Sequence, residues 1–397
     1  MLDYLPFLIF LMILAVFLQA GPALTVFYMI VGIFLLGLWW NKRALRHVKI
    51  ERHYEDHAYL NEIVHVRLTI ENESILPILW LEIHESLPVN LRAGQNVKQV
   101  FSLGIRASHQ IDYDLRAFKR GYFELGPTSI STGDPLGMVK PAQQNFPSTL
   151  LTIYPQIVGL SELGLPSRSP FGTIQRQNPI FEDPTRLMGK RAFQSGDSVR
   201  RVDWKATAAI GDLMVKLYEA SIALNLTVLL DLQRESYNIQ SIHDSTELAV
   251  TAAASLAAWA KRRQHTMGLL TNGLDPHTGL TVEKPIPPGK GAGHFINVLE
   301  LLARIQIGET RSTLQLIQDA RARLSWGTTL IYISGGVSTG AFKQLFQARK
   351  AGLNPVILLV GHPTHLAEDR RVASGYHLPL YAAGSVQALR TMAAKVL

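Results

Sequence analysis

The chain has 397 residues, 47% of them hydrophobic, which is enough to build two or three compact units, each with its own core. It carries 39 Lys and Arg against 31 Asp and Glu, and the net charge of +8 favours contact with anionic lipid or nucleic acid without singling out either. The absence of cysteine excludes disulfides, a thiolate nucleophile and cysteine-ligated zinc.

Two uncharged apolar runs open the chain, over residues 4–18 and 23–40. Each is near the length at which a helix spans about 30 Å of hydrocarbon. A cleaved signal peptide is the alternative, but such a peptide carries basic residues near its start, where this chain has Asp3. The pattern predicts a transmembrane helical hairpin over residues 1–41.

Basic residues follow the second apolar run at once. By the positive-inside rule they stay in the cytoplasm, which predicts that everything after the hairpin lies on the cytoplasmic side and that the lipid bilayer is a partner. The residues concerned are Lys42, Arg43, Arg46, Lys49 and Arg52.

Residues 48–160 follow a period of two, as in the stretch that contains Ile63, Val66, Leu68 and Ile70. Pro, Gly and Asn separate the apolar runs at short intervals. This is typical of strands joined by turns, so we predict an all-β, sandwich-like domain. Residues 161–190 are rich in Ser, Pro and Gly and show no period, which predicts a linker.

A charged segment, GDSVRRVDWKATA, runs from Gly196 to Ala208. Asp197 is well suited to cap a helix, which we predict over residues 198–209. At about 100° per residue, one face of that helix is apolar and is expected to be buried. Its members are Val199, Val202, Ala206, Ala209 and Ile210.

The neighbouring face of the predicted helix is a polar stripe of Arg200, Asp203 and Thr207, with Trp204 at its edge. We expect Arg200 to pair with Asp203 and to lie against the indole. The stripe is a solvated helix face, a clasp between two domains or a surface that grips a partner. Because an indole beside a polar stripe usually buries most of its area, Trp204 argues against the first of these.

The stretch RAFQSGDSVRRVDWKATA, followed by GDLMVKLYE, resembles the signature of the bacterial family catalogued as domain of unknown function 58, and we assign residues 191–221 to it. In place of the Arg that the family commonly has after Thr-Ala, this chain has Ala209. The positions that match are Arg191, Phe193, Gly196, Asp197, Arg200, Asp203, Trp204, Ala206, Thr207, Ala208, Lys216 and Glu219.

The resemblance implies a layout in which a membrane hairpin and a β-rich segment precede a von Willebrand factor A-like α/β domain, here residues 222–397. Together with the charge pattern it implies a multi-pass protein of the bacterial inner membrane. As partner it implies an AAA+ ATPase of the MoxR type, in cell-envelope assembly or stress response.

The C-terminal residues support an α/β domain in their own right. Short apolar runs, such as residues 223–232, alternate with stretches of helical period, which predicts a mostly parallel sheet covered by helices on both faces. Ligands bind such sheets beyond the carboxyl ends of the strands, where Asp231, Thr271 and Ser334 should cluster.

Domains of the von Willebrand A type often bind a divalent cation through Asp-x-Ser-x-Ser. This chain keeps Asp231 but has Gln233 and Glu235 at the serine positions, and Ser334 stands where an acidic residue would be expected. A hard cation needs several well-placed oxygens. We therefore expect the cation site to be lost, with Asp231 as a degenerate candidate and no cofactor.

Two further signals are weak. The stretch PPGKGAG around Lys290 lacks the spacing of a phosphate-binding loop and is not expected between a strand and its helix. His362 and His365 lie near Glu368 and Asp369, but no third metal ligand is evident.

Two functions remain in view. The first is an adaptor or scaffold that binds a MoxR-type ATPase through the signature segment. The second is a hydrolase at the membrane surface that uses Asp197, Asp203 or Asp231. No nucleophile or metal set accompanies these carboxylates, which favours the first. Lys and Arg are spread out and do not alternate with aromatic residues, so a nucleic-acid partner is not expected.

Overall fold

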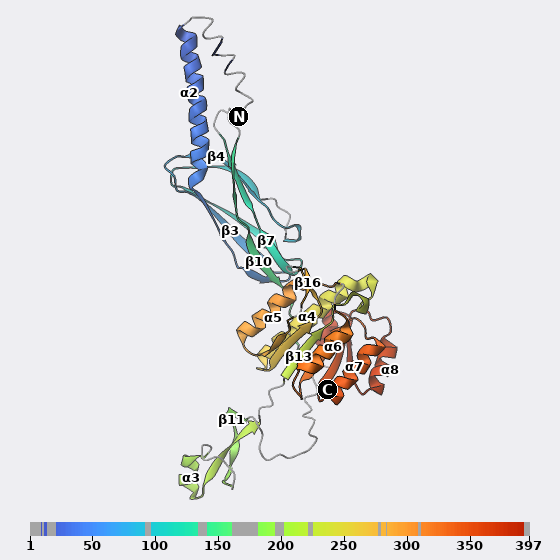
Figure 1. Ribbon diagram of the computed structural model, residues 1–397. Coiled ribbons are helices and arrows are strands. Elements are labelled where there is room, and N and C mark those ends of the chain that lie inside the picture. Colours follow the sequence, from blue (N-terminus) through green and yellow to red (C-terminus); the bar gives the residue numbers. More distant parts are fainter. Residues whose placement is uncertain are drawn as a thin grey trace. The chain divides into compact units, whose positions relative to one another are not determined.

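A computed structural model describes most of the chain (Figure 1), and it divides into two compact units, residues 1–156 with 299–304 and residues 157–298 with 305–397. The described residues are 9, 12, 13, 21–91, 97–133, 141–160, 182–194, 202–220, 225–276, 279–282, 284–308 and 311–392.

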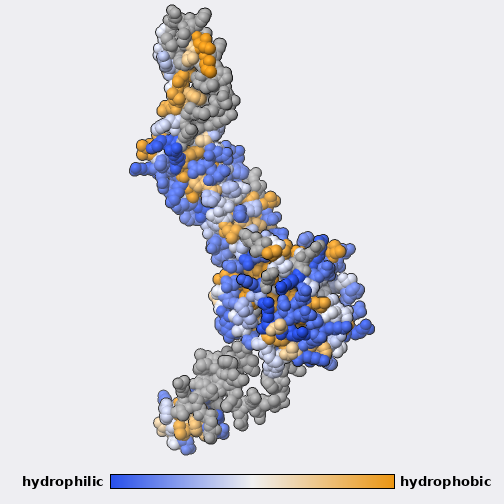
Figure 2. All heavy atoms as spheres, viewed as in Figure 1, coloured by the Kyte–Doolittle hydropathy of each residue, from blue (hydrophilic) through white to orange (hydrophobic). Residues whose placement is uncertain are grey.

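Helix α2 (Gly21–Ala44) corrects the first prediction. Across the ranges just given, none of the helices combines the length with the apolar character that a membrane crossing requires, so the predicted transmembrane hairpin is wrong. The end of α2 continues through η1 (Leu45–His47) into the β-rich unit, where Ala44 and Leu45 are buried in the core. Ala44 and Leu45 follow the apolar run itself, which ends at Trp40. Other side chains of the helix, among them Leu35 and Leu36, are exposed (Figure 2).

The first unit is rich in strands, as predicted. They form three described sheets, in the orders β1-β3-β6, β2-β10-β7 and β5-β4-β8-β9, and a short helix, η2 (Val89–Leu91), precedes β5. The strands are β1 (Val48–His53), β2 (His57–Tyr59), β3 (Ile63–Asn72), β4 (Ile78–Glu85), β5 (Lys98–Leu103), β6 (Ser108–Arg116), β7 (Gly121–Leu125), β8 (Thr128–Thr132), β9 (Ala142–Phe146) and β10 (Thr149–Tyr154).

The period of two explains how these strands pack. In β3 the side chains of Val64, Val66, Leu68 and Ile70 are buried, and those between them face outward or lie partly covered. Ile63 is 53% exposed, because the buried register of β3 starts at Val64. Apolar side chains of all three described sheets meet in one core, which includes Leu68, Ile83, Ile130 and Leu151.

Two strands and a short helix carry the signature segment. Strand β11 (Glu182–Ala192) pairs antiparallel with β12 (Met214–Ala220), and helix α3 (Trp204–Ile210) lies between them in sequence. We call these elements the signature hairpin. Strand structure thus begins at Glu182, inside the segment predicted to be a linker.

The C-terminal unit contains the predicted mostly parallel sheet, in the order β17-β14-β13-β18-β19-β20, with only β17 antiparallel to its neighbour. The strands are β13 (Asn225–Leu230), β14 (Thr266–Thr271), β17 (Ile286–Gly289), β18 (Thr329–Ser334), β19 (Asn354–Val360) and β20 (Leu380–Ala383), and a small ribbon pairs β15 (Leu274–Asp275) with β16 (Leu280–Thr281).

Helices connect these strands. Helix α4 packs against α9, and α6 packs against α7. The helices are η4 (Arg234–Ser236), η5 (Ile239–Ser241), α4 (Ile242–Arg262), α5 (Ala292–Arg304), α6 (Thr313–Arg323), α7 (Thr339–Lys350), α8 (Leu366–Gly375) and α9 (Val386–Met392).

This strand order is that of a doubly wound sheet, with β13 as the first strand. The chain leaves β13 toward β14 on one side and later returns to pair β18 on the other. The direction of winding therefore reverses between β13 and β18, and ligands bind such sheets at the carboxyl ends of the strands beside that point. Asp231 and Ser334 both lie there.

Candidate functional site

Asp231 comes directly after β13 and is completely buried. Its carboxylate accepts hydrogen bonds from six described groups. On Oδ1 these are the Gln233 backbone N–H at 3.1 Å and the Asn272 amide at 2.9 Å. On Oδ2 they are four hydroxyls, from Ser236 at 2.7 Å, Thr313 at 2.9 Å, Tyr332 at 2.9 Å and Ser334 at 3.0 Å.

Two buried tyrosines, Tyr237 and Tyr332, donate hydrogen bonds to Asp231. Burial, and secondarily the charge of Asp231, raises the pKa of both Tyr237 and Tyr332 well above the usual range. The Tyr332 hydroxyl donates to the carboxylate, and the Tyr237 hydroxyl donates to the Asp231 carbonyl at 2.5 Å. The carboxylate thus ties together the ends of two strands, the η4 turn and the start of α6.

The predicted cluster of Asp231, Thr271 and Ser334 is therefore formed in part. Ser334 donates to Asp231, whereas the Thr271 hydroxyl accepts from the Gly273 backbone N–H at 3.0 Å. The next residue, Asn272, takes the place expected for Thr271. Sequence reasoning did not find it, because residues 271 and 272 both end the same strand and only the geometry decides which one turns inward.

The residues around Asp231 do not fit a resident hard cation. Such a cation takes about six to eight oxygens, usually from more than one carboxylate. Here both carboxylate oxygens already accept protein donors, and the Gln233 side-chain carbonyl accepts from the Thr313 backbone N–H. Within the described ranges, no group of three or more His, Cys, Asp or Glu side chains is placed to hold a metal ion.

Within the signature hairpin, polar side chains fix helix α3 to the two strands. Asp203 caps the helix by accepting a bond from the Ala206 N–H at 3.2 Å, and its other oxygen lies 2.9 Å from the Lys190 ammonium on β11. The hydrogen bond from Lys190 is the main cause that lowers the pKa of Asp203. The Thr207 hydroxyl accepts from the Met214 N–H at 3.0 Å, which fastens α3 to β12.

The predicted helix over residues 198–209 is corrected by this arrangement. Val202 forms a β-bridge with Val215 and Asp203 has extended backbone, so the helix begins at Trp204. The cap is Asp203 because it is the residue whose carboxylate reaches the free N–H groups of the first turn. Of the predicted buried face, Val202 and Ala206 are buried and Ile210 is 61% exposed.

Trp204 also differs from the prediction, since its side chain is 65% exposed. The partner of Asp203 is Lys190, which lies just before the quoted signature and was missed for that reason. Gly196, Asp197 and Arg200 lie outside the described residues, so the predicted pair of Arg200 with Asp203 is not described.

The other described signature residues lie in strands β11 and β12 or next to them. The Phe193 backbone N–H donates to the Leu213 carbonyl at 2.8 Å, and the Arg191 guanidinium donates to the Ala192 carbonyl at 3.0 Å. Lys216 is the β12 residue opposite Lys190 and further lowers the pKa of Asp203 by its charge. The backbone of Glu219 belongs to β12, and its side chain is not described.

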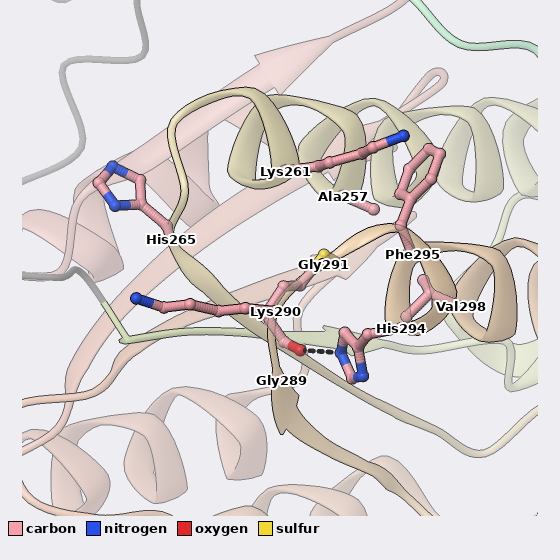
Figure 3. A pocket seen from close by; sticks show the side chains of 10 residues that line it. Ala257, Lys261, His265, Gly289, Lys290, Gly291, His294, Phe295 and Val298 are labelled. Carbon is pink, nitrogen blue, oxygen red and sulfur yellow. Dashed lines mark hydrogen bonds between the residues drawn. The ribbon is translucent and has the colours of Figure 1, made fainter.

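Lys290 corrects another expectation, because its loop does join strand β17 to helix α5. Figure 3 shows that the basic side chains near it point in different directions: Lys290 extends away from Lys261, whose ammonium lies 4.6 Å from the centre of the Phe295 ring. His294 is bonded to the Met267 carbonyl at 2.6 Å. These groups do not converge on one anion.

The fold and the site define a class of protein with a β-rich unit and a doubly wound α/β unit. At the carboxyl ends of the α/β strands, the Asp231 carboxylate accepts hydrogen bonds from neighbouring side chains of the same unit. Residues 189–345 match the family described as "Protein of unknown function DUF58", as the signature predicted. That region spans part of the signature hairpin and the α/β unit as far as α7.

The chain is also similar to "Uncharacterized protein YeaD" of Bacillus subtilis (strain 168), with 24% identity over 243 residues. The match spans 60% of this chain and 57% of that relative.

Among solved structures, the CARDB domain of a Pyrococcus furiosus protein matches with 12% identity and a TM-score of 0.21, over 27% of this chain and 91% of that one. Proximal thread matrix protein 1 from the mussel byssus matches with 12% identity and a TM-score of 0.33, over 44% and 47%. Neither likeness bears on function.

Proposed function

We propose that the chain is a protein–protein interaction module, an adaptor or scaffold that binds its partner through the signature hairpin. The observation that carries the proposal is the exposure of Trp204 at the first turn of α3, a helix whose position is fixed by three contacts. Asp203 caps α3, Lys190 holds Asp203, and Thr207 fastens the helix to β12.

The surface proposed for the partner is apolar. Trp204, Ile210 and Leu213 are 65%, 61% and 47% exposed, and apolar residues gather on this hairpin (Figure 2). Burying one such side chain contributes about 1.5–3 kcal/mol, and tryptophan is enriched among the residues that dominate binding energies. A rigid helix that presents an indole loses little conformational entropy when it binds.

In this proposal the polar stripe positions α3, whereas the sequence favoured a clasp between two domains or a surface that grips a partner. The side chains of Asp203 and Thr207 are bonded within the hairpin, so they position α3 and leave the contact with the partner to its apolar residues. The resemblance to the family supplies the partner's class, an AAA+ ATPase of the MoxR type acting in cell-envelope assembly or stress response. The proposal does not depend on a membrane anchor.

The hydrolase alternative finds little support in the geometry. Asp231 is engaged by six described donors and Asp203 by a lysine and a helix N-terminus, so neither is free to act as an acid, base or nucleophile. The third carboxylate, Asp197, lies outside the described residues.

Co-purification tests the proposal. An affinity-tagged full-length chain is recovered from its native host, and bound proteins are identified for the wild type, Trp204→Ala, Ile210→Ser and Arg200→Ala. Trp326→Ala is the matched control, because Trp326 is a 54% exposed indole in the α/β unit. We expect a MoxR-type ATPase with the wild type and the control, and its loss with Trp204→Ala and Ile210→Ser. Equal recovery with every variant contradicts the proposal.

A further inference from the structure

A cavity of about 450 Å³ opens beyond the carboxyl ends of β13 and β18, next to the buried Asp231. Its walls come from the η4 turn, the first residues of α6 and α7 and the start of α8. The volume lies within the range of about 300–1,000 Å³ that ligand-binding pockets occupy.

The side chain of Asp369 is the strongest indication that this cavity binds a ligand. It lies in the first turn of α8, lines the cavity and is only 8% exposed. Within the described part of the chain its carboxylate accepts no hydrogen bond and pairs with no cation; its backbone N–H alone is engaged, by the His365 carbonyl. Burial raises the pKa of Asp369, the charge of His365 lowers it and that of Glu368 raises it. Because the carboxylate lines the cavity and has no described partner, a ligand in the cavity can pair with it.

A second carboxylate faces the same space from the η4 turn. Glu235 lines the cavity, and the Gln233 side-chain amide donates to it, while the carbonyl of the same amide accepts from the Thr313 backbone N–H. Glu235 is thereby oriented from the start of α6. The hydroxyls of Ser236 and Thr313, which could otherwise serve an anion, are directed to Asp231.

The rim of the cavity is partly aliphatic. Leu314 and Val337 line the same cavity as the two carboxylates, and Leu314 is 37% exposed. Arginine and lysine side chains match this combination, because their stems pack on apolar surface while their charged ends seek carboxylates. A free anion is opposed by the two negative groups, and among the described residues no group of three or more His, Cys, Asp or Glu side chains is placed to hold a metal ion.

We propose that this cavity binds a basic side chain, a guanidinium or ammonium group that a partner protein presents to Asp369 and Glu235. The stem of that side chain packs on Leu314 and Val337. The site lies in the α/β unit, and it does not rest on the function proposed for the signature hairpin.

Binding of a pair of small probes tests this proposal. N-acetyl-arginine amide and its neutral counterpart N-acetyl-citrulline amide are titrated into the purified full-length chain, with calorimetry or NMR as readout. We expect saturable binding of the arginine probe and at least about tenfold weaker binding of the citrulline probe, since the neutral probe cannot form charge-assisted hydrogen bonds with the carboxylates. Equal binding of both probes, or saturation by neither, overturns the proposal.

Matched variants locate the site. Asp369→Asn and Glu235→Gln are nearly isosteric and should each weaken the arginine probe about tenfold. Glu368→Gln is the control, because Glu368 is exposed on the same helix and does not line the cavity. Binding unaffected by both cavity variants contradicts the assignment, and Glu235→Gln decides the question where Asp369→Asn fails to fold. Spermidine that binds at least about tenfold tighter than the arginine probe would identify a free polyamine as the ligand and overturn the assignment to a protein side chain.

Discussion

The Lys190 ammonium lies 2.9 Å from the Asp203 carboxylate, and this contact joins strand β11 to the residue that starts helix α3. One carboxylate thus performs two tasks, because its other oxygen caps the helix. A seven-residue helix is too short to be stable alone, so its position depends on such anchors. The exposed Trp204 that follows Asp203 is presented in a fixed pose for this reason.

Removal of the cap should loosen α3 locally. For Asp203→Ala we expect amide exchange at Ala206 about two- to tenfold faster than in the wild type, because a first-turn N–H loses its acceptor. Asp203→Asn keeps an acceptor and should lie between the two. Hydrogen exchange read by mass spectrometry measures this, with Asp212→Asn as an exposed control on the same hairpin. Exchange that is equal in all four proteins would contradict the capping role.

The Lys190–Asp203 contact also predicts a dependence on pH. The folded-state pKa of Asp203 is lowered from the ordinary value of 3.8. A carboxyl of this kind stabilises the fold fully above its unfolded pKa and loses that contribution as pH falls through its folded pKa. Protection of the α3 amides should therefore be constant above about pH 5 and fall below pH 3.8, and Lys190→Met should move the fall to higher pH. A fall that Lys190→Met does not move would remove Lys190 as the cause.

Asp231→Ala should strongly destabilise the α/β unit. The substitution leaves buried hydroxyls and an amide without an acceptor, and each such group costs about 1–3 kcal/mol. We expect a loss of at least about 3 kcal/mol in the free energy of unfolding, measured by chemical denaturation. Asp319→Ala, which removes the exposed partner of Arg311, is the control and should cost about 0–1 kcal/mol. Equal losses would mean that Asp231 does not organise the strand ends.

Divalent cations should not affect the α/β unit. Because the Asp231 oxygens already accept protein donors, we expect the melting temperature to be the same with millimolar Mg²⁺, with Mn²⁺ and with EDTA. Stabilisation by a cation that binds the folded state would follow mass action and be lost in Asp231→Asn. A cation-dependent shift of that kind would show that the hydroxyl groups around Asp231 bind a metal ion.

The β-rich unit contains a buried ion pair that makes a separate prediction. Arg52 and Glu85 lie 2.6 Å apart with side chains 5% and 0% exposed, and Arg52 also donates to Thr149 at 2.7 Å. Glu85→Ala leaves a buried guanidinium without its partner and should cost about 3–5 kcal/mol. The double variant Arg52→Met with Glu85→Leu should recover most of that loss, as measured by denaturation of the full-length chain. A double variant as unstable as Glu85→Ala would contradict this view of the pair.

Sequence patterns predicted the sheets better than the helix at the signature. The period of two in β3 and the alternation of apolar and helical stretches after residue 222 reflect burial, which both sequence and fold must satisfy. The apolar N-terminal run misled, because a run of uncharged residues in the sequence is not by itself a helix with the length and apolar character that a membrane crossing requires, and none of the described helices has both. The start of α3 was misplaced because two aspartates, Asp197 and Asp203, are equally good caps by residue type.

The candidate site was predictable only at its centre. Asp231 followed from its place after an apolar strand, at the carboxyl end where ligands bind such sheets. Asn272, Thr313 and Tyr332 come from three other elements that meet Asp231 only in the folded sheet. The exposure of Trp204 was not predicted either, because the helix was expected to start at residue 198 and it starts at Trp204.

Photo-crosslinking from position 204 tests the role of the signature hairpin most directly. A photoreactive phenylalanine analogue replaces Trp204 in the full-length chain, and the same analogue at Trp326 provides the comparison. We predict a crosslink from position 204 to a second polypeptide, an AAA+ ATPase, which position 326 does not give. Crosslinks from position 204 only to this chain itself would mean that the indole closes an internal contact and that the hairpin does not bind a partner there.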